Sequence, residues 1–358
     1  MTIIDIVKYI SILGLLRLND MEKRKLMALG KSSIVIAIPK PWLRKSKLEK
    51  GDTVHLNIQS DGSLGVYPNS VEDKRNEIDL IIAEDDNKDV IIRRLISCYL
   101  NGFSLVHLSS KNIFSPIQQE TIREITRTLY MRIMKASSKE ITIQSTLDES
   151  MDSIFSGVER MHTITCSMCA DVIESIKNRD KKLAEAVLTF ENDVDQFMYF
   201  LLRLIRMATQ NSSIAHKLGL DMLDCLDVQT LVHRIEKIAD HVNNIAINLL
   251  PIFDRVGDEQ SGVLSILSEA AEIAFNSYAR AFDSFILRDI TNVDEIIDNQ
   301  KDVDELIYLI TPLPFSGKLS ERDNLCPICS IRESVSRISE YSGDIAELAL
   351  DRALRYPT

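Results

Sequence analysis

Apolar residues recur at three- and four-residue steps through long stretches of the second half of the chain, which is the period of an amphipathic helix. In one such stretch the apolar stripe consists of Leu231, Val232, Ile235, Ile238, Ala239, Val242, Ile245, Ala246 and Leu249. At about 100° per residue, His233, Glu236 and Asp240 then fall together on another face. The pattern predicts one long helix with a buried stripe and an acidic face.

The same acidic face occurs a second time, in residues 337–352. Glu340 and Asp344 take the places of the first pair at one common sequence separation, so the two helices match in register. Carboxylates four residues apart on a helix repel each other by roughly 0.2–0.5 kcal/mol unless a positive charge lies near them. A metal ion is one such charge, and ligand sets made only of oxygen suit hard or borderline cations such as Mg²⁺, Mn²⁺ and iron.

A second repeated feature precedes each of these helices. Glu191 and Asp195 stand four residues apart, and Asp195 is the last residue of an Asp-Val-Asp sequence. That sequence recurs in the second half, where it ends at Asp304. Two helical bundles are therefore expected, at 150–251 and 260–356. A single acidic pair at this spacing is usually a solvated helix face, whereas the matching order of two pairs in two repeats favours a site.

The segment 150–356 resembles the PhoU family, phosphate-uptake regulators built from two three-helix bundles. In that family, Glu(Asp)-x-x-x-Asp motifs of each bundle face each other and bind iron, zinc or manganese clusters. The resemblance implies a first metal site of Glu191, Asp195, Glu236 and Asp240, and a second of Asp304, Glu340 and Asp344. The second copy departs from the family, because Gln300 stands where the first copy has Glu191. The second site is therefore expected to be poorer, or to recruit Asp298 or Asp302. Magnesium is a further candidate ion.

The front of the chain has a different pattern. Alternating apolar residues predict strands at Ser33–Ile38, Val54–Ile58 and Leu64–Tyr67, separated by a Pro-Lys-Pro-Trp break and an Asp-Gly turn. A β-rich module of this size, 21–70, has too little core to be stable alone. We expect it to dimerise.

Charge also separates this module from the rest of the chain. Residues 21–50 hold nine Lys and Arg against two Glu, although the whole chain has a net charge of −11. A basic module on an acidic body suits an anionic partner such as nucleic acid. The alternative is that these lysines only keep a small β module soluble.

Four short sequences in this module closely resemble the AbrB/SpoVT swapped-hairpin domain: Gly30-Lys31-Ser32-Ser33, the run 34–38, Pro39-Lys40-Pro41-Trp42 and Leu48-Glu49-Lys50-Gly51-Asp52. In that family two chains exchange hairpins to form one β-barrel, and basic residues contact DNA. The resemblance implies DNA contacts from Lys23, Arg24, Lys25, Lys31, Lys40 and Arg44. An AbrB-like head fused to a PhoU-like body resembles the archaeal phosphate-uptake regulators.

Between head and body, 76–147, strands and helices alternate. The expected strands are Ile78–Ala83, Phe103–Leu108 and Glu140–Gln144, and the expected helices are Asp89–Leu100 and Pro116–Tyr130. This order predicts a small α/β layer. It contains no glycine-rich phosphate loop and no nucleophile motif, so we interpret it as a spacer or a dimerisation layer.

Cysteines form two Cys-x-x-Cys pairs, Cys166 with Cys169 and Cys326 with Cys329, and His162 precedes the first pair by one helical turn. Four thiols suit tetrahedral zinc if the fold brings the pairs together, but their separation is far outside zinc-ribbon spacing. Cysteine is also among the most buried residue types, so reduced core thiols are the favoured interpretation.

Together these features predict a mainly α protein with a β-rich N-terminal module. At 45% hydrophobic and 6% aromatic residues the composition is that of a helix-rich globular chain, and no apolar run reaches the length of a membrane span, so a cytoplasmic protein is expected. Residues 1–20 are interpreted as a loosely attached leader or a non-native start.

The favoured function is a non-enzymatic, phosphate-responsive transcriptional regulator that binds DNA as a homodimer. The alternative is a PhoU-type adaptor that contacts a phosphate transporter or sensor protein without binding DNA. A metal-dependent phosphohydrolase is a weaker hypothesis, because clustered carboxylates around two cations can activate water.

Overall fold

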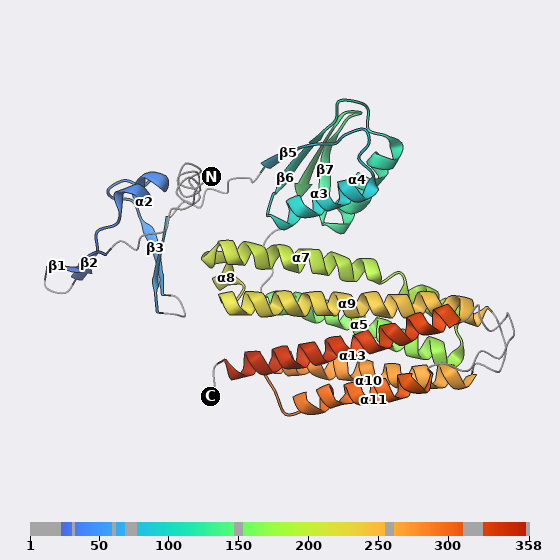
Figure 1. The fold of residues 1–358 in the computed structure, drawn as a ribbon. Coiled ribbons are helices and arrows are strands. Elements are labelled where there is room, and N and C mark those ends of the chain that lie inside the picture. Colours follow the sequence, from blue (N-terminus) through green and yellow to red (C-terminus); the bar gives the residue numbers. More distant parts are fainter. Residues whose placement is uncertain are drawn as a thin grey trace, which may run out of the picture. The chain divides into compact units, whose positions relative to one another are not determined.

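The computed structural model describes residues 23–30, 33–58, 62–68, 77–146, 153–254, 261–310 and 325–355. The chain divides into two compact units, Met1–Lys74 and Arg75–Thr358, and each is described by itself (Figure 1). The predicted leader, 1–20, and the candidate DNA contact Lys31 lie outside the described residues.

The first unit, called the head below, consists of two antiparallel hairpins and one short helix. Strand β1 (Met27–Leu29) pairs with β2 (Ser33–Val35), and β3 (Val54–Ile58) pairs with β4 (Leu64–Pro68). Helix α2 (Lys40–Lys45) follows Pro39 and has a proline in its first turn, where a missing N–H costs no helical hydrogen bond. The described residues of the head form two separate two-stranded sheets and no closed barrel, so the predicted swapped-hairpin barrel is not confirmed in the single chain.

Apolar side chains of the head remain exposed. None of its described side chains is buried. The large apolar side chains that are at least half exposed are Leu26, Met27, Leu29, Ile34, Ile36, Leu56, Ile58 and Leu64. Isolated two-stranded hairpins are at best marginally stable in water. The head therefore lacks a core of its own within the described residues.

The second unit begins with the α/β layer. Its elements are β5 (Glu77–Ile81), α3 (Lys88–Leu100), β6 (Leu105–Ser109), α4 (Pro116–Thr128), β7 (Met131–Ala136) and β8 (Glu140–Ser145). The sheet has the order β5-β6-β8-β7, with β5 and β6 parallel and the other neighbours antiparallel. Both helices contribute apolar side chains to one core with the sheet, including Ile91, Ile122 and Val106. Strand β7 was missing from the sequence prediction.

The rest of the second unit is the helical body. Its first bundle contains the long helices α5 (Ile154–Asn178), α7 (Glu191–Gln210) and α9 (Met222–Phe253), with the short helices α6 (Lys181–Val187) and α8 (Ser212–Lys217). Its second bundle contains α10 (Ser261–Leu287), α11 (Val293–Leu309) and α13 (Leu325–Leu354). One continuous apolar core runs through both bundles. The chain is mainly helical, as predicted.

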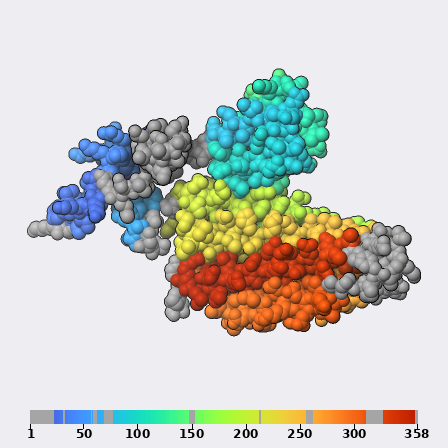
Figure 2. All heavy atoms as spheres, in the orientation of Figure 1, coloured from blue at the N-terminus to red at the C-terminus, as the bar shows by residue number. Residues whose placement is uncertain are grey.

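Helices α9 and α13 join the two bundles. They lie side by side along the body, as the yellow and red surfaces in Figure 2 show. All nine residues of the predicted apolar stripe of α9 are buried. A polar seam accompanies them, in which the Asn244 amide donates to Ser330 (2.9 Å) and Ser334 (2.8 Å) of α13.

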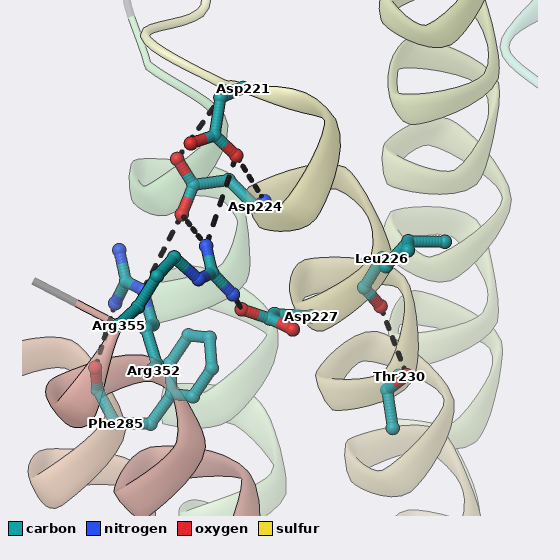
Figure 3. Close-up of polar contacts among 8 residues, drawn as sticks. All are labelled: Asp221, Asp224, Leu226, Asp227, Thr230, Phe285, Arg352 and Arg355. Carbon is teal, nitrogen blue, oxygen red and sulfur yellow. Dashed lines mark hydrogen bonds and ion pairs between the residues drawn. The ribbon is translucent and has the colours of Figure 1, made fainter. Parts of the chain in front are cut away.

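A cluster of salt bridges joins the start of α9 to the end of α13 (Figure 3). Arg355, at the end of α13, reaches the first turns of α9, where it pairs with Asp221 (3.8 Å), Asp224 (3.3 Å) and Asp227. Asp221 also caps α9, because its carboxylate accepts from the backbone N–H of Asp224 at 2.7 Å. Three carboxylates around one largely buried guanidinium fix the relative position of the two helices.

Arg203 ties the α/β layer to the body. This buried side chain of α7 donates to the backbone oxygens of Tyr99, Gly102 (3.3 Å) and Phe103 (3.2 Å), and its guanidinium lies over the Tyr99 ring. The last carbonyls of a helix have no partner inside the helix. Arg203 supplies that partner at the end of α3 and so positions the layer on α7.

No helix in the described parts of the chain is long and apolar enough to cross a membrane.

Candidate functional site

The four residues predicted for the first metal site come together between α7 and α9. Glu191 lies at the start of α7 and Asp195 one turn later, while Glu236 and Asp240 lie one turn apart on α9. The apolar stripes of the two helices pack against each other and leave these carboxylates half-buried at the edge of the interface. We call this group the acidic cluster.

The carboxylates of the acidic cluster oppose one another's ionisation. Burial, and then the neighbouring Asp240, raise the pKa of Asp195 to about 6. The same two causes raise the pKa of Glu236 to about 7 and also raise the pKa of Glu191. Raised carboxyl pKa values mean that the fully charged cluster is destabilising unless a cation neutralises part of it.

Lys237 provides part of that neutralisation. Its ammonium lies 2.8 Å from Asp240 Oδ2 and 3.3 Å from Glu236 Oε1. Its hydrogen bond to Asp240 raises the pKa of Lys237, so the side chain is charged at neutral pH. On the other side of the cluster, the buried amide of Asn243 donates to the Glu191 carboxylate.

The donor set fits a hard cation in its chemistry, because it consists of carboxylates. Within the described residues, however, no three His, Cys, Asp or Glu side chains converge closely enough to hold a metal ion. At the acidic cluster, the Lys237 ammonium lies within hydrogen-bonding distance of two of the carboxylates. A bound cation would take the place of that ammonium.

The second predicted set is arranged differently. Asp304 of α11 and Glu340 of α13 line one open groove of about 460 Å³, which also includes Arg332 and Arg337. Arg337 pairs with Glu340 at 2.6 Å. Asp344, the third member of the set, pairs instead with Arg234 of α9 at 3.0 Å. Arginines therefore take up two of the three carboxylates.

Gln300 lies against α13, since its side-chain oxygen is 4.0 Å from where a Cβ at Gly343 would stand. Of the two possible substitutes, Asp298 is exposed and pairs with Lys301 at 2.7 Å, and Asp302 is also exposed. Neither forms part of a converging ligand group among the described residues. The two repeats thus match in sequence but differ in their charge pairs.

The two cysteine pairs have different surroundings. Cys169 is buried and Cys166 half-buried on α5, in line with the predicted core thiols, whereas Cys326 and Cys329 on α13 are exposed, so that interpretation is wrong for the second pair. His162 is stacked on Phe282, and its Nδ1 lies 2.8 Å from the Tyr278 hydroxyl. Burial lowers the pKa of His162 to about 4, so the ring is neutral at physiological pH. It packs within the core and belongs to no zinc-binding group among the described residues.

The candidate DNA contacts on the head lie at its surface. All of the described ones are exposed: Lys23, Arg24, Lys25, Lys40 and Arg44. They occupy the segment before β1 and the region of α2.

One segment of the chain matches a known protein family. The family model for the PhoU domain matches residues 158–249, which run from α5 to α9 and include the whole acidic cluster. The chain therefore carries a PhoU domain, and the head, the α/β layer and the second bundle lie outside the matched segment.

Two solved structures resemble part of the chain. The phosphate transport system regulatory protein PhoU from Streptococcus pneumoniae aligns with a TM-score of 0.44 and 15% identity, covering 55% of this chain and 91% of that one. PhoU from Pseudomonas aeruginosa aligns with a TM-score of 0.43 and 18% identity, covering 56% and 95%. No curated protein matches the chain.

The raised pKa of Glu236 predicts a pH-dependent stability. When the pKa of a carboxyl group is higher in the folded than in the unfolded protein, its ionisation lowers the free energy of unfolding. This loss is absent below the unfolded pKa of 4.5 and complete above the folded pKa of about 7. Relative to wild type, Glu236→Gln should therefore gain about 1–2 kcal/mol in free energy of unfolding between pH 4.5 and pH 8, after allowance for solvent screening. Urea denaturation in metal-free buffer across that range measures the difference.

The corresponding change in the second repeat, Glu340→Gln, is the matched control. It removes a carboxylate paired with Arg337, so its stability relative to wild type should stay level or fall over the same range. An equal gain for both variants would contradict the assignment of the cost to the acidic cluster.

Proposed function

We propose that the protein is a non-enzymatic regulator of phosphate transport that binds DNA through a dimeric head and a metal ion through the acidic cluster of its body. The PhoU-domain match over residues 158–249 supports the link to phosphate transport. The surface of the head supports the link to DNA. This function would place the protein in the cytoplasm.

The observation that carries the proposal is the absence of any buried side chain among the described residues of the head. Exposed apolar residues occur on both hairpins, for example Ile34 on β2 (71% exposed) and Leu56 on β3 (61% exposed). A monomeric domain does not expose so large a share of its apolar side chains. A second copy of the head offers the same unpaired hairpins and apolar faces, so pairing or exchange of hairpins would build the missing core.

Dimerisation would also prepare the head to bind DNA. It would double the number of exposed Lys and Arg side chains in one rigid module, and cations of this kind release counterions when they contact backbone phosphates. The head is basic although the chain is acidic, so electrostatic attraction would direct the head, and not the body, toward DNA.

In the body, Glu191, Asp195, Glu236 and Asp240 are the proposed metal ligands, with iron, zinc, manganese or magnesium as candidates. Such an ion would supply a positive centre to which a phosphate oxygen can bind. Lys237 would compete with the ion for Glu236 and Asp240, because its ammonium already lies within hydrogen-bonding distance of both.

The second candidate function is an adaptor that contacts a phosphate transporter or sensor protein without binding DNA. It is favoured by the PhoU-domain match, which lies wholly within the body and includes no part of the head. The DNA-binding experiment below separates the two functions.

Dimerisation through the head predicts that a charge on its apolar surface separates the protomers. Ile34→Glu introduces a carboxylate at a residue that is 71% exposed in the single chain, so it should leave a monomer intact but prevent association. Sedimentation velocity should show a dimer for wild type and a monomer for the variant. Ile113→Glu, at a 66% exposed residue of the α/β layer, is the control and should remain dimeric. A monomeric wild-type protein would refute the proposed dimer.

DNA binding predicts a steep dependence of affinity on salt. Promoter fragments from phosphate-transport genes should bind the wild-type protein tightly at low salt. Replacing Lys23, Arg24 and Lys25 with alanine removes up to three phosphate contacts per head, so the slope of log affinity against log salt should fall by roughly 2–3. Fluorescence anisotropy across a salt series measures both quantities.

The control for this experiment is a triple alanine variant of exposed lysines in the α/β layer, namely Lys111, Lys135 and Lys139. It changes the net charge equally and should leave the slope unchanged. If the wild-type protein does not bind DNA even at low salt, the DNA-binding proposal fails and the adaptor function stands.

Competition between Lys237 and a metal ion predicts tighter metal binding when the ammonium is removed. We expect Lys237→Met to bind Mn²⁺ roughly tenfold more tightly than wild type, which corresponds to about 1.4 kcal/mol. Isothermal titration calorimetry of the metal-free protein measures the affinity, and Asp240→Asn should abolish binding. Lys301→Met, which removes the exposed partner of Asp298, should behave as wild type. If neither the wild type nor Lys237→Met binds Mn²⁺, or any other candidate ion, the metal site is refuted.

A further inference from the structure

The two Cys-x-x-Cys pairs have the same spacing but opposite environments. Cys166 and Cys169 lie in the middle of α5, where one is half-buried and the other buried. Cys326 and Cys329 lie at the start of α13, and both are exposed. The same Cys-x-x-Cys spacing therefore occurs once inside the core and once at the surface of one chain.

An intact helix keeps such a pair apart. Side chains three residues apart on a helix have Cβ atoms about 5–6 Å apart, whereas a disulfide requires about 3.5–4.5 Å. The helix must therefore open locally before the two sulfurs can bond. The cost of opening decides which pair can react.

Opening is costly at Cys166 and Cys169. Their turn lies inside a helix of 25 residues, so opening breaks backbone hydrogen bonds on both sides and disturbs a packed core. Burial also raises the pKa of the Cys166 thiol to about 11, which disfavours the reactive thiolate.

Opening costs little at Cys326 and Cys329. The first four N–H groups of a helix have no helical acceptor, and one of these positions is held by Pro327, which has no N–H at all. The first buried side chain among the described residues of α13 is Ile331, which lies beyond the pair. The first turn can therefore rearrange without moving a fully buried side chain, although the partly buried Ile328 would shift against the core.

We propose that Cys326 and Cys329 are a reversible redox site that forms an intrahelical disulfide by exchange with a low-molecular-weight disulfide. The thiolate of one cysteine attacks a sulfur of that disulfide, which forms a mixed disulfide and releases one small thiol. The second cysteine then attacks the protein sulfur of the mixed disulfide, which closes the ring and releases the second small thiol. The small disulfide is reduced by two electrons and the cysteine pair is oxidised by two, and the two cysteine protons leave on the released thiols.

The disulfide would act on the groove and on the polar seam. Cys329 lines the groove between α11 and α13, together with Arg332 and Ser336. The next residue, Ser330, accepts hydrogen bonds from Asn244 (2.9 Å) and Asn248 (3.2 Å) of α9. Rearranging the first turn of α13 moves the residues that immediately precede this contact, so oxidation alters the groove and the junction of the two bundles.

The test uses the full-length protein in buffers containing oxidised and reduced glutathione at graded ratios. Remaining thiols are alkylated at each ratio, and peptides are mapped by mass spectrometry. We expect the free thiols of Cys326 and Cys329 to disappear together, while the mass of the peptide that contains them falls by two hydrogen atoms. Excess reduced glutathione should restore both thiols. In the reduced protein they should alkylate roughly tenfold faster, or more, than Cys166 and Cys169.

Two variants distinguish ring closure from simple surface reactivity. Cys326→Ser should accumulate a stable mixed disulfide between glutathione and Cys329, because no second thiol can displace it. Cys166→Ser should oxidise as wild type does. The proposal is overturned if the wild-type pair stays reduced under oxidising conditions, if both cysteines carry separate glutathione adducts, or if they link two chains.

Discussion

Burial of the apolar stripe of α9 is the constraint on which the body depends. This helix contributes buried side chains from Cys225 to Ile252 and packs against α5 and α7 on one side and α13 on the other. Because that stripe must face the core, the directions in which the other faces of α9 point are fixed. One carries Glu236 and Asp240 to the edge of the α7 interface, and another carries Asn244 to the seam with α13.

Helix packing holds the carboxylates of the acidic cluster close together, and their mutual repulsion lowers the stability of the fold. Four carboxylates at a half-buried interface would separate if the helices were free, and the raised pKa values of Asp195 and Glu236 reflect that repulsion. The helices cannot separate, because the hydrophobic contacts beneath the cluster hold them together. Lys237 offsets part of the cost, and the proposed metal ion would offset more.

Head and body obtain their stability in different ways. The body has a large continuous core, and single arginines such as Arg203 and Arg355 fix its parts by bonding helix ends. The head has short hairpins, no buried side chain among its described residues and a row of exposed apolar groups. If the head associates as proposed, the amount of its dimeric form would depend on protein concentration, whereas the stability of the body would not.

Local patterns in the sequence determined much of the fold and the spacing of the carboxylates on each helix. The three- and four-residue period identified every buried position of the predicted α9 stripe, and the alternation at 54–58 matched strand β3 residue for residue. The two halves of the acidic cluster, Glu191 with Asp195 and Glu236 with Asp240, were also predictable, because the members of each pair lie one helical turn apart. These features follow from backbone geometry, which repeats along the chain independently of what lies beside it.

Only the tertiary structure decided which side chains meet across helices. Asp344 matches Asp240 in sequence, but it pairs with Arg234, because α13 lies antiparallel beside α9. Cys326 and Cys169 belong to identical motifs, yet one is exposed at the start of a helix and the other is buried inside one. Strand β7 was missed for a related reason, since it exists through pairing with β8. Charge pairing and burial depend on neighbours that are distant in the sequence, whereas helical period and strand alternation do not.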